Sequence, residues 1–75
     1  MKIQKPFDLL GQSIGNQVLV QMKGNKQIRG VLQAFDQHMN IVLSDAEELE
    51  EGEVKAKIGY VIVRGDTIVY VSPSV

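Results

Sequence analysis

Hydrophobic residues first recur at a helical spacing near the start of the chain, where Phe7, Leu10 and Ile14 lie at positions i, i+3 and i+7. Pro6 precedes them, and a proline suits the first turn of a helix because its missing N–H would have no helical partner there. The pattern predicts a short helix over about 6–12. A helix of this length is marginal by itself, so we expect Phe7 and Leu10 to cover one open end of a hydrophobic core.

After residue 16 the hydrophobic pattern changes to a period of two, which is typical of β-strands. Strands are predicted over 17–23, 26–35, 39–46, 54–64 and 67–71, so that the sheet region ends near residue 72. A two-residue hairpin turn is predicted at 24–25, where the sequence reads Gly-Asn. A second is predicted at 65–66, where glycine comes first as in a type II′ turn.

Two glycines, Gly30 and Gly59, fall inside predicted strands. A glycine weakens a strand unless a bend or a close backbone approach requires it, so we expect the sheet to bend at these positions. The third strand is apolar on both faces at 41–43, which is more burial than a small open two-layer sheet would supply. The pattern therefore predicts a mainly β fold, with a short N-terminal helix followed by a five-stranded, strongly bent antiparallel sheet that forms a small open barrel.

The fourth and fifth strands are expected to present apolar edges, since no charge or proline lies inside 67–71. Natural proteins seldom leave such edges open, because an unpaired strand is a template for pairing with another chain. Pairing with a second copy would close the edges. Head-to-tail repetition of that contact gives a ring, which is the assembly that we expect.

The composition narrows the class of protein. The 75 residues make one domain, spanning 1–75, and the lack of cysteine excludes disulfides and thiolate metal sites. The sequence holds no phosphate loop, no nucleophile with its own base and no metal-ligand cluster, so we expect no enzymatic activity, no metal and no other cofactor. With no signal peptide and no apolar run of about 18 residues, a soluble, cytoplasmic protein is expected.

The charge distribution restricts how the protein could bind nucleic acid. A net charge of −1 argues against a broad phosphate-binding surface, so any such binding must be local and depend more on bases than on the backbone. The charge is also uneven, because five glutamates lie within 47–53. That acidic stretch is expected to be a solvated loop or the projecting end of a hairpin.

Polar side chains gather on two turns between apolar strands. The turn at 36–40 carries the imidazole of His38 and the amide of Asn40, and the turn at 64–66 carries the guanidinium of Arg64 and a carboxylate. Functional residues are often found on turns that a rigid scaffold holds in place. If the two turns meet, they form a pocket for a flat ring that makes hydrogen bonds.

The same residues carry a family resemblance. Segment 36–43 (DQHMNIVL), with Gly30 upstream, resembles the first Sm motif, and segment 62–68 (IVRGDTI) resembles the second. Over 6–73 the chain is similar to Sm-like (Lsm) proteins, and to the archaeal Sm-like proteins in particular. That resemblance implies a homo-oligomeric ring, usually a homoheptamer. It also implies a ribonucleoprotein role in RNA processing, in which the ring binds single-stranded, uridine-rich RNA around its pore.

Mapped by motif position, the resemblance assigns base contacts to His38, Asn40 and Arg64, while Gly65 and Asp66 complete the pocket. The chemistry agrees, since an amide offers a donor and an acceptor that match N3–H and O4 of uracil. A flipped amide would suit cytosine equally well. We therefore expect Asp66 to fix the amide of Asn40 by accepting its second proton. The planar groups of His38 and Arg64 would hold the two faces of the base.

Other residues near the motifs have simpler interpretations. Met39 is expected to belong to the core, and Asp36 to cap the turn through an Asx-type hydrogen bond. In archaeal relatives a tyrosine often precedes the motif aspartate and contributes to a second RNA contact on the helix face. Phe35 occupies that position here and cannot donate a hydrogen bond, so a secondary RNA contact at Lys5 and Phe35 is a weaker hypothesis.

Two further interpretations stay open at this stage. His38 could be a plain turn residue and Asn40 could bond its own backbone at the start of a strand. The protein could also be a structural ring that scaffolds protein partners of RNA processing without base-specific RNA binding. The complete set of polar residues on the two turns favours RNA, because scaffolding alone would not require a base-shaped pocket.

Overall fold

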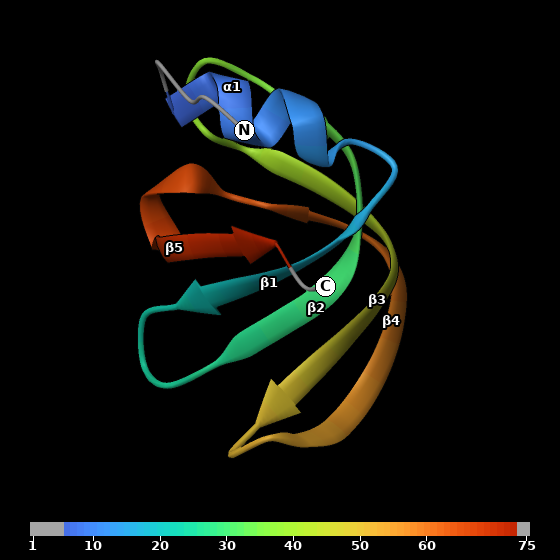
Figure 1. Cartoon of the computed structure of the whole chain (residues 1–75). Coiled ribbons are helices and arrows are strands. Elements are labelled where there is room, and N and C mark those ends of the chain that lie inside the picture. Colours follow the sequence, from blue (N-terminus) through green and yellow to red (C-terminus); the bar gives the residue numbers. More distant parts are fainter. Residues whose placement is uncertain (1–5, 74–75) are drawn as a thin grey trace.

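The structure, a computed structural model, describes residues 6–73 and begins with the predicted helix, α1, at Pro6–Ser13 (Figure 1). Leu10 is buried in the core, as predicted, whereas the side chain of Phe7 lies outside the described part of the structure. A hydrogen bond from Gly15 N to Leu32 O (2.8 Å) fastens the chain after the helix to the sheet. The helix thus covers one end of the barrel. Within residues 6–73 no helix is long and apolar enough to cross a membrane.

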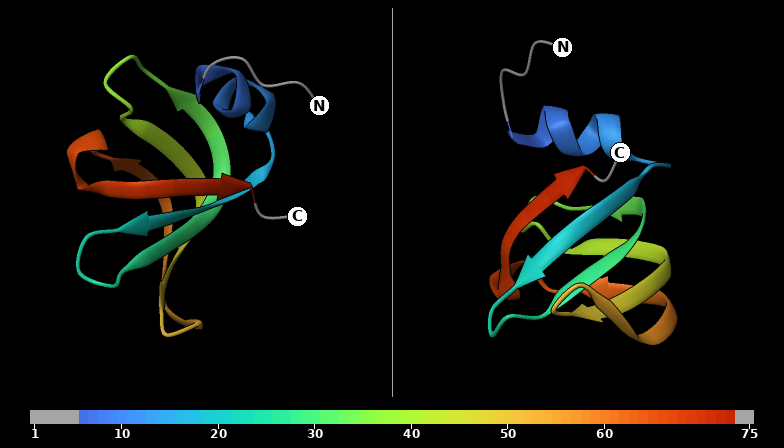
Figure 2. Two further views of the ribbon diagram at one scale, coloured as in Figure 1. Left: turned by 60° about the vertical axis from the view of Figure 1, so that its left-hand side comes forward. Right: turned by 60° about the horizontal axis from the view of Figure 1, so that its bottom comes forward.

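Five antiparallel strands follow the helix. They are β1 (Gln17–Met22), β2 (Gln27–Phe35), β3 (Ile41–Glu50), β4 (Glu53–Val63) and β5 (Ile68–Pro73). They form one sheet in the order β4-β3-β2-β1-β5, and each strand pairs antiparallel with its neighbours. Figure 2 shows how strongly this sheet bends on itself. The predicted fold is confirmed: a short helix followed by a five-stranded, bent, open antiparallel sheet.

Most strand ends differ from the pattern-based prediction, by one to four residues. β3 continues to Glu50 and β4 begins at Glu53, so the acidic stretch is the projecting end of a hairpin and not a loop. Strand alternation continues among the glutamates, since Leu49 is buried while Glu50 is exposed. β5 extends to Pro73, past the predicted end, because a proline is tolerated on an edge strand.

The core lies on the inner face of the bent sheet and beneath the helix. It consists of Leu10, Val18, Val20, Ile28, Leu32, Ile41, Leu43, Ala46 and Val63. Gly30 is needed for close approach between strands, since an added Cβ would lie 3.0 Å from Ser44 O and 3.1 Å from Leu43 Cβ. Gly59 adopts φ +82°, in the left-handed region that favours glycine, beside irregular pairing of β3 with β4. Both glycines allow the curvature that the sequence predicted.

The two predicted hairpin turns have different outcomes. The β1–β2 turn is closed by a hydrogen bond from Met22 N to Lys26 O (2.8 Å), with left-handed conformations at Gly24 and Asn25, so three residues, not two, lie between the bonded positions. The prediction of a type II′ turn at 65–66 is wrong. Gly65–Thr67 form one turn of 3-10 helix (η1), in which Thr67 N donates to Arg64 O at 3.0 Å and Gly65 stays outside the left-handed region.

The two edge strands, β4 and β5, expose large apolar side chains, as predicted. On β4 these are Val54, Ile58, Tyr60 and Ile62, and on β5 they are Val69 and Tyr70. Tyr60 and Ile62 are the most exposed of them, at 76% and 70%. Each edge therefore offers both unpaired backbone groups and apolar surface to a neighbour.

Candidate nucleic-acid interface

Asp36 organises the turn that joins β2 to β3. Its Oδ1 accepts hydrogen bonds from His38 N (2.9 Å) and Asn40 N (3.1 Å), and Asp36 N donates to Asn40 O (3.1 Å). The predicted Asx-type cap is confirmed. Met39 adopts φ 65° within this turn and packs against the core, also as predicted, so His38 is left exposed at the outside of the turn.

The hydrogen bonds to Asp36 also change its acidity. The side-chain bond from Asn40, together with the backbone bonds from Asn40 and His38, lowers the pKa of Asp36 from its ordinary value. Desolvation acts in the opposite direction, and its effect is smaller than that of the side-chain bond. Asp36 is therefore an ionised acceptor at neutral pH, and it can hold several N–H groups at once.

The turns around residues 38 and 65 meet in direct contact. Gly65 N donates to Asn40 Oδ1 at 2.8 Å, across 25 positions of sequence. A Cβ added to Gly65 would collide with His38 O and would lie 2.9 Å from the carbonyl carbon of Met39. Glycine is required here by the close approach of two backbones and not by an unusual φ value. This contact brings the two sequence motifs together.

The amide of Asn40 is held from both ends. Its Nδ2 donates to Asp36 Oδ2 (3.1 Å), while its Oδ1 accepts from Gly65 N (2.8 Å). Because an amide has two N–H donors and two acceptor sites, one donor and one acceptor remain available to a ligand. The structure thus fixes which end of the amide is oxygen and which is nitrogen.

The prediction that Asp66 orients Asn40 is wrong. Asp66 Oδ2 instead accepts from Arg64 Nη2 at 2.8 Å, two residues away, and Asp36 orients the amide. The sequence did contain a signal for this arrangement. An Asx cap uses one carboxylate oxygen, so the second oxygen of Asp36 was free for a side chain in the same turn.

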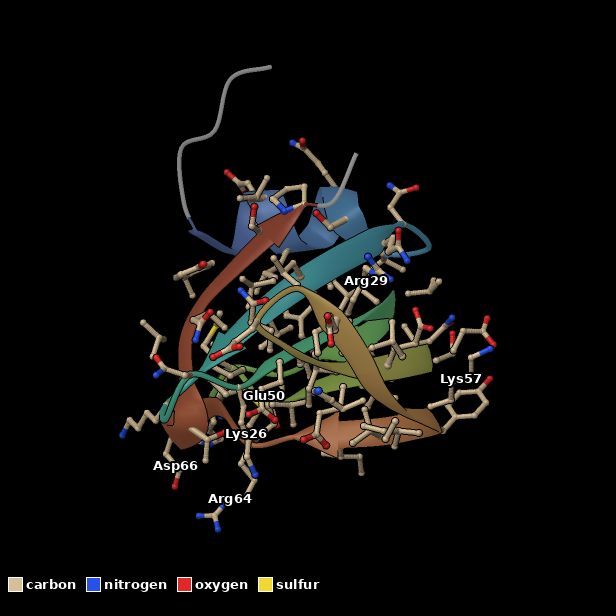
Figure 3. All side chains as sticks on the ribbon, turned by 90° about the horizontal axis from the view of Figure 1, so that it is seen from below. Lys26, Arg29, Glu50, Lys57, Arg64 and Asp66 are labelled. Carbon is tan, nitrogen blue, oxygen red and sulfur yellow. The ribbon has the colours of Figure 1, made fainter. Side chains whose placement is uncertain are left out.

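Arg64 is held loosely. Its ion pair with Asp66 joins side chains that are 76% and 62% exposed, and exposed pairs of this kind contribute little to stability. Figure 3 shows both side chains projecting from one end of the molecule. The guanidinium can therefore leave Asp66 for a ligand at small cost.

A depression of about 440 Å³ lies beside the contact between the turns. Asn40, Arg64 and Asp36 line it together with the apolar residues Ala34, Phe35, Val42 and Ile62. His38 and Asp66 do not line this depression, and Gly65 lines a separate one of about 290 Å³ on the side of Met39 and β5. Lys5, named with Phe35 as a secondary contact, lies outside the described residues. The arrangement combines apolar lining residues, an oriented amide and an exposed guanidinium.

Within 6–73 there is no group of three or more histidine, aspartate or glutamate side chains that could hold a metal ion.

Comparison with protein families matches residues 8–73 to the LSM domain. A relative from Methanococcoides burtonii, named as an snRNP Sm-like protein, is 52% identical over 69 residues, covering 92% of this chain and 96% of its own length. A relative of the same name from Archaeoglobus fulgidus is 50% identical over 70 residues, covering 93% of this chain and 91% of its own.

Two solved structures are also similar in three dimensions. The Sm protein of Pyrococcus abyssii in complex with a uridine heptamer has a TM-score of 0.92 at 38% identity, covering 95% of this chain and 100% of that chain. A heptameric archaeal Sm protein has a TM-score of 0.84 at 46% identity, covering 89% and 97%.

Proposed function

Because the chain belongs to the LSM domain family of Sm-like proteins, we propose that it forms a non-enzymatic, homo-oligomeric ring whose subunits bind single-stranded, uridine-rich RNA in pockets around a central pore. Its role would be RNA processing or ribonucleoprotein assembly in the cytoplasm. The observation that carries the proposal is the amide of Asn40, which is held by Asp36 and Gly65 with one donor and one acceptor left free.

The fixed amide favours uracil over cytosine as the proposed ligand. Uracil offers N3–H as a donor beside O4 as an acceptor, and these match Oδ1 and Nδ2 of Asn40. Cytosine carries the opposite pair, N4–H as the donor and N3 as the acceptor. To bind the same amide, cytosine would have to turn over in the site or the amide would have to flip. Flipping would cost the hydrogen bonds to Asp36 and Gly65.

Base stacking supplies the remaining affinity. His38 and Arg64 are both exposed and both planar, and stacking on an aromatic side chain contributes about 1–3 kcal/mol per base. One such pocket binds weakly. A ring of pockets that engage successive nucleotides binds far more tightly, because each bound nucleotide raises the effective concentration of the next.

Ring assembly is supported by the two apolar edges of the sheet. β4 and β5 are the outermost strands, and a heptameric archaeal Sm protein is among the similar structures. We expect β4 of one subunit to pair with β5 of the next. Replacing both Tyr60 and Val69 by lysine should convert the ring to monomers in native mass spectrometry, because charge would be placed on both apolar edges.

The matched control for the edge variant is Ile14→Lys. Ile14 is an apolar residue of 48% exposure that follows α1 and lies on neither edge strand. The ring should survive this change. An intact ring in the double variant, or equal disruption of the ring in the control, would contradict pairing through these edges.

The proposed function is tested by fluorescence anisotropy with labelled oligouridine, oligocytidine and oligoadenine, with native mass spectra of the same samples. Selective binding of oligouridine by a ring-sized species is expected. A ring that binds none of the three would contradict the proposal and favour the alternative, a structural ring that scaffolds protein partners.

A further inference from the structure

The turn between β1 and β2 is attached to the turn that carries Arg64. Met22 pairs with Ile68 in the sheet, and Lys23 N donates to Thr67 O at 3.1 Å. Figures 1 and 2 show the β1–β2 turn and the connection between β4 and β5 on the same side of the molecule in every view. The β1–β2 turn therefore keeps a fixed position relative to the candidate base site.

The base site itself is poorly suited to phosphate. Arg64 is paired with Asp66, and the carboxylate of Asp36 lies beside Asn40, so these three charged side chains together carry a net negative charge. A bound oligonucleotide brings one phosphate for each nucleotide. Cations near the site, but outside it, can compensate that charge and strengthen binding.

Lys23 is a cation that can meet this need. It is exposed and takes part in no ion pair within residues 6–73, whereas Arg29 is paired with Glu47 and Lys55 with Glu53. Its backbone is bonded directly to the turn at 64–67. The flexible side chain of a lysine can reach a phosphate over a range of positions, so the contact does not restrict how the base is placed.

Lys26 belongs to the same turn but has a different electrostatic environment. It lines a depression of about 540 Å³ together with Glu50 and Glu51, at the acidic end of the β3–β4 hairpin, and Lys23 does not line this depression. Figure 3 shows Lys26 and Glu50 close together at that end. The nearby carboxylates oppose the approach of a phosphate to Lys26.

We propose that Lys23 binds a backbone phosphate of the RNA next to the base held at Asn40, and so extends the candidate interface onto the β1–β2 turn. The inference rests on the proposed function. It separates the two tasks of the interface: Asn40 selects the base, while Lys23 supplies affinity that is independent of sequence.

The test compares Lys23→Gln with its matched control Lys26→Gln, each measured with labelled oligouridine and oligocytidine from low to moderate salt. Lys23→Gln should weaken oligouridine binding about tenfold or more at low salt. Affinity should also depend less steeply on salt. The negative slope of log affinity against log salt should shrink in magnitude by about 0.7 for each phosphate that the protein no longer neutralises. The ratio of uridine to cytidine affinity should not change. Lys26→Gln should stay within about threefold of the wild-type affinity.

The outcomes are distinguishable. If the wild-type ring binds oligouridine and Lys23→Gln keeps its salt slope, the phosphate contact is overturned while the base pocket stands. An equal loss of oligouridine affinity in both variants would also overturn the phosphate contact, because such a loss would reflect only the net charge of the protein. No binding by the wild type would overturn the proposed function together with this inference. Native mass spectra of both variants must show the intact ring, which neither substitution should disturb, since both side chains are exposed.

Discussion

Gly65→Ala is expected to abolish selective oligouridine binding and to destabilise the protein. The added Cβ would collide with His38 O and would lie 2.9 Å from the carbonyl carbon of Met39, and neither is the end of a flexible side chain. The two turns would have to separate, which would break the 2.8 Å hydrogen bond from Gly65 N to Asn40 Oδ1. Asn40 would then keep only one of the two hydrogen bonds that orient its amide.

The expected size of the effect follows from the kind of contact. Forcing extra atoms into a packed site costs about 1–3 kcal/mol in the free energy of unfolding. The affinity for oligouridine should fall by at least about a hundredfold, because the amide of Asn40 would be misoriented in every subunit that binds the RNA. Denaturant unfolding would measure the first quantity, and fluorescence anisotropy with oligouridine the second.

Gly11→Ala provides the control. Gly11 lies in α1 with nothing within 4 Å of an added Cβ, so alanine should be tolerated there and should favour the helix by up to about 1 kcal/mol. Wild-type affinity in Gly65→Ala would contradict the role assigned to the contact between the turns.

The fold was largely predictable because its signals are local. The change from helical spacing to a period of two separates α1 from β1, and the mid-strand glycines Gly30 and Gly59 mark the sites where the sheet bends. The strand ends were less predictable. Among the glutamates of β3, the charge left open whether the stretch is a loop or the end of a hairpin, and burial of Leu49 is consistent with a strand that stays paired to its end.

The meeting of the two turns was predictable, but the hydrogen-bond partners of their side chains were not. Asn40 and Arg64 do line one depression, as the two motifs suggested. Two carboxylates, Asp36 and Asp66, were equally suited by chemistry to accept the second amide proton of Asn40. Asp36 lies in the same turn as Asn40 and accepts that proton, whereas the path of the second turn directs Asp66 toward Arg64. Gly65 was likewise identified for the wrong reason, since its role is close approach and not a left-handed turn.

Asp36→Asn is expected to relax the preference for uridine over cytidine while leaving the turn folded. The asparagine oxygen could still accept from His38 N and Asn40 N, which preserves the cap. Its amide nitrogen would face Nδ2 of Asn40, where Asp36 Oδ2 now accepts at 3.1 Å, and two donors would then oppose each other. Turning the Asn40 amide over would relieve that conflict but would set its nitrogen against Gly65 N.

The two orientations of Asn40 would therefore become similar in free energy. A hydrogen bond to a charged group contributes about 1.5–3 kcal/mol, so the ratio of uridine to cytidine affinity should fall about tenfold or more. Asp66→Asn is the matched control, because Asp66 contacts Arg64 and not Asn40. The ratio of uridine to cytidine affinity in this variant should equal that of the wild type. The opposite result, with selectivity abolished only in Asp66→Asn, would mean that Asp66 replaces Asp36 beside Asn40 when RNA binds.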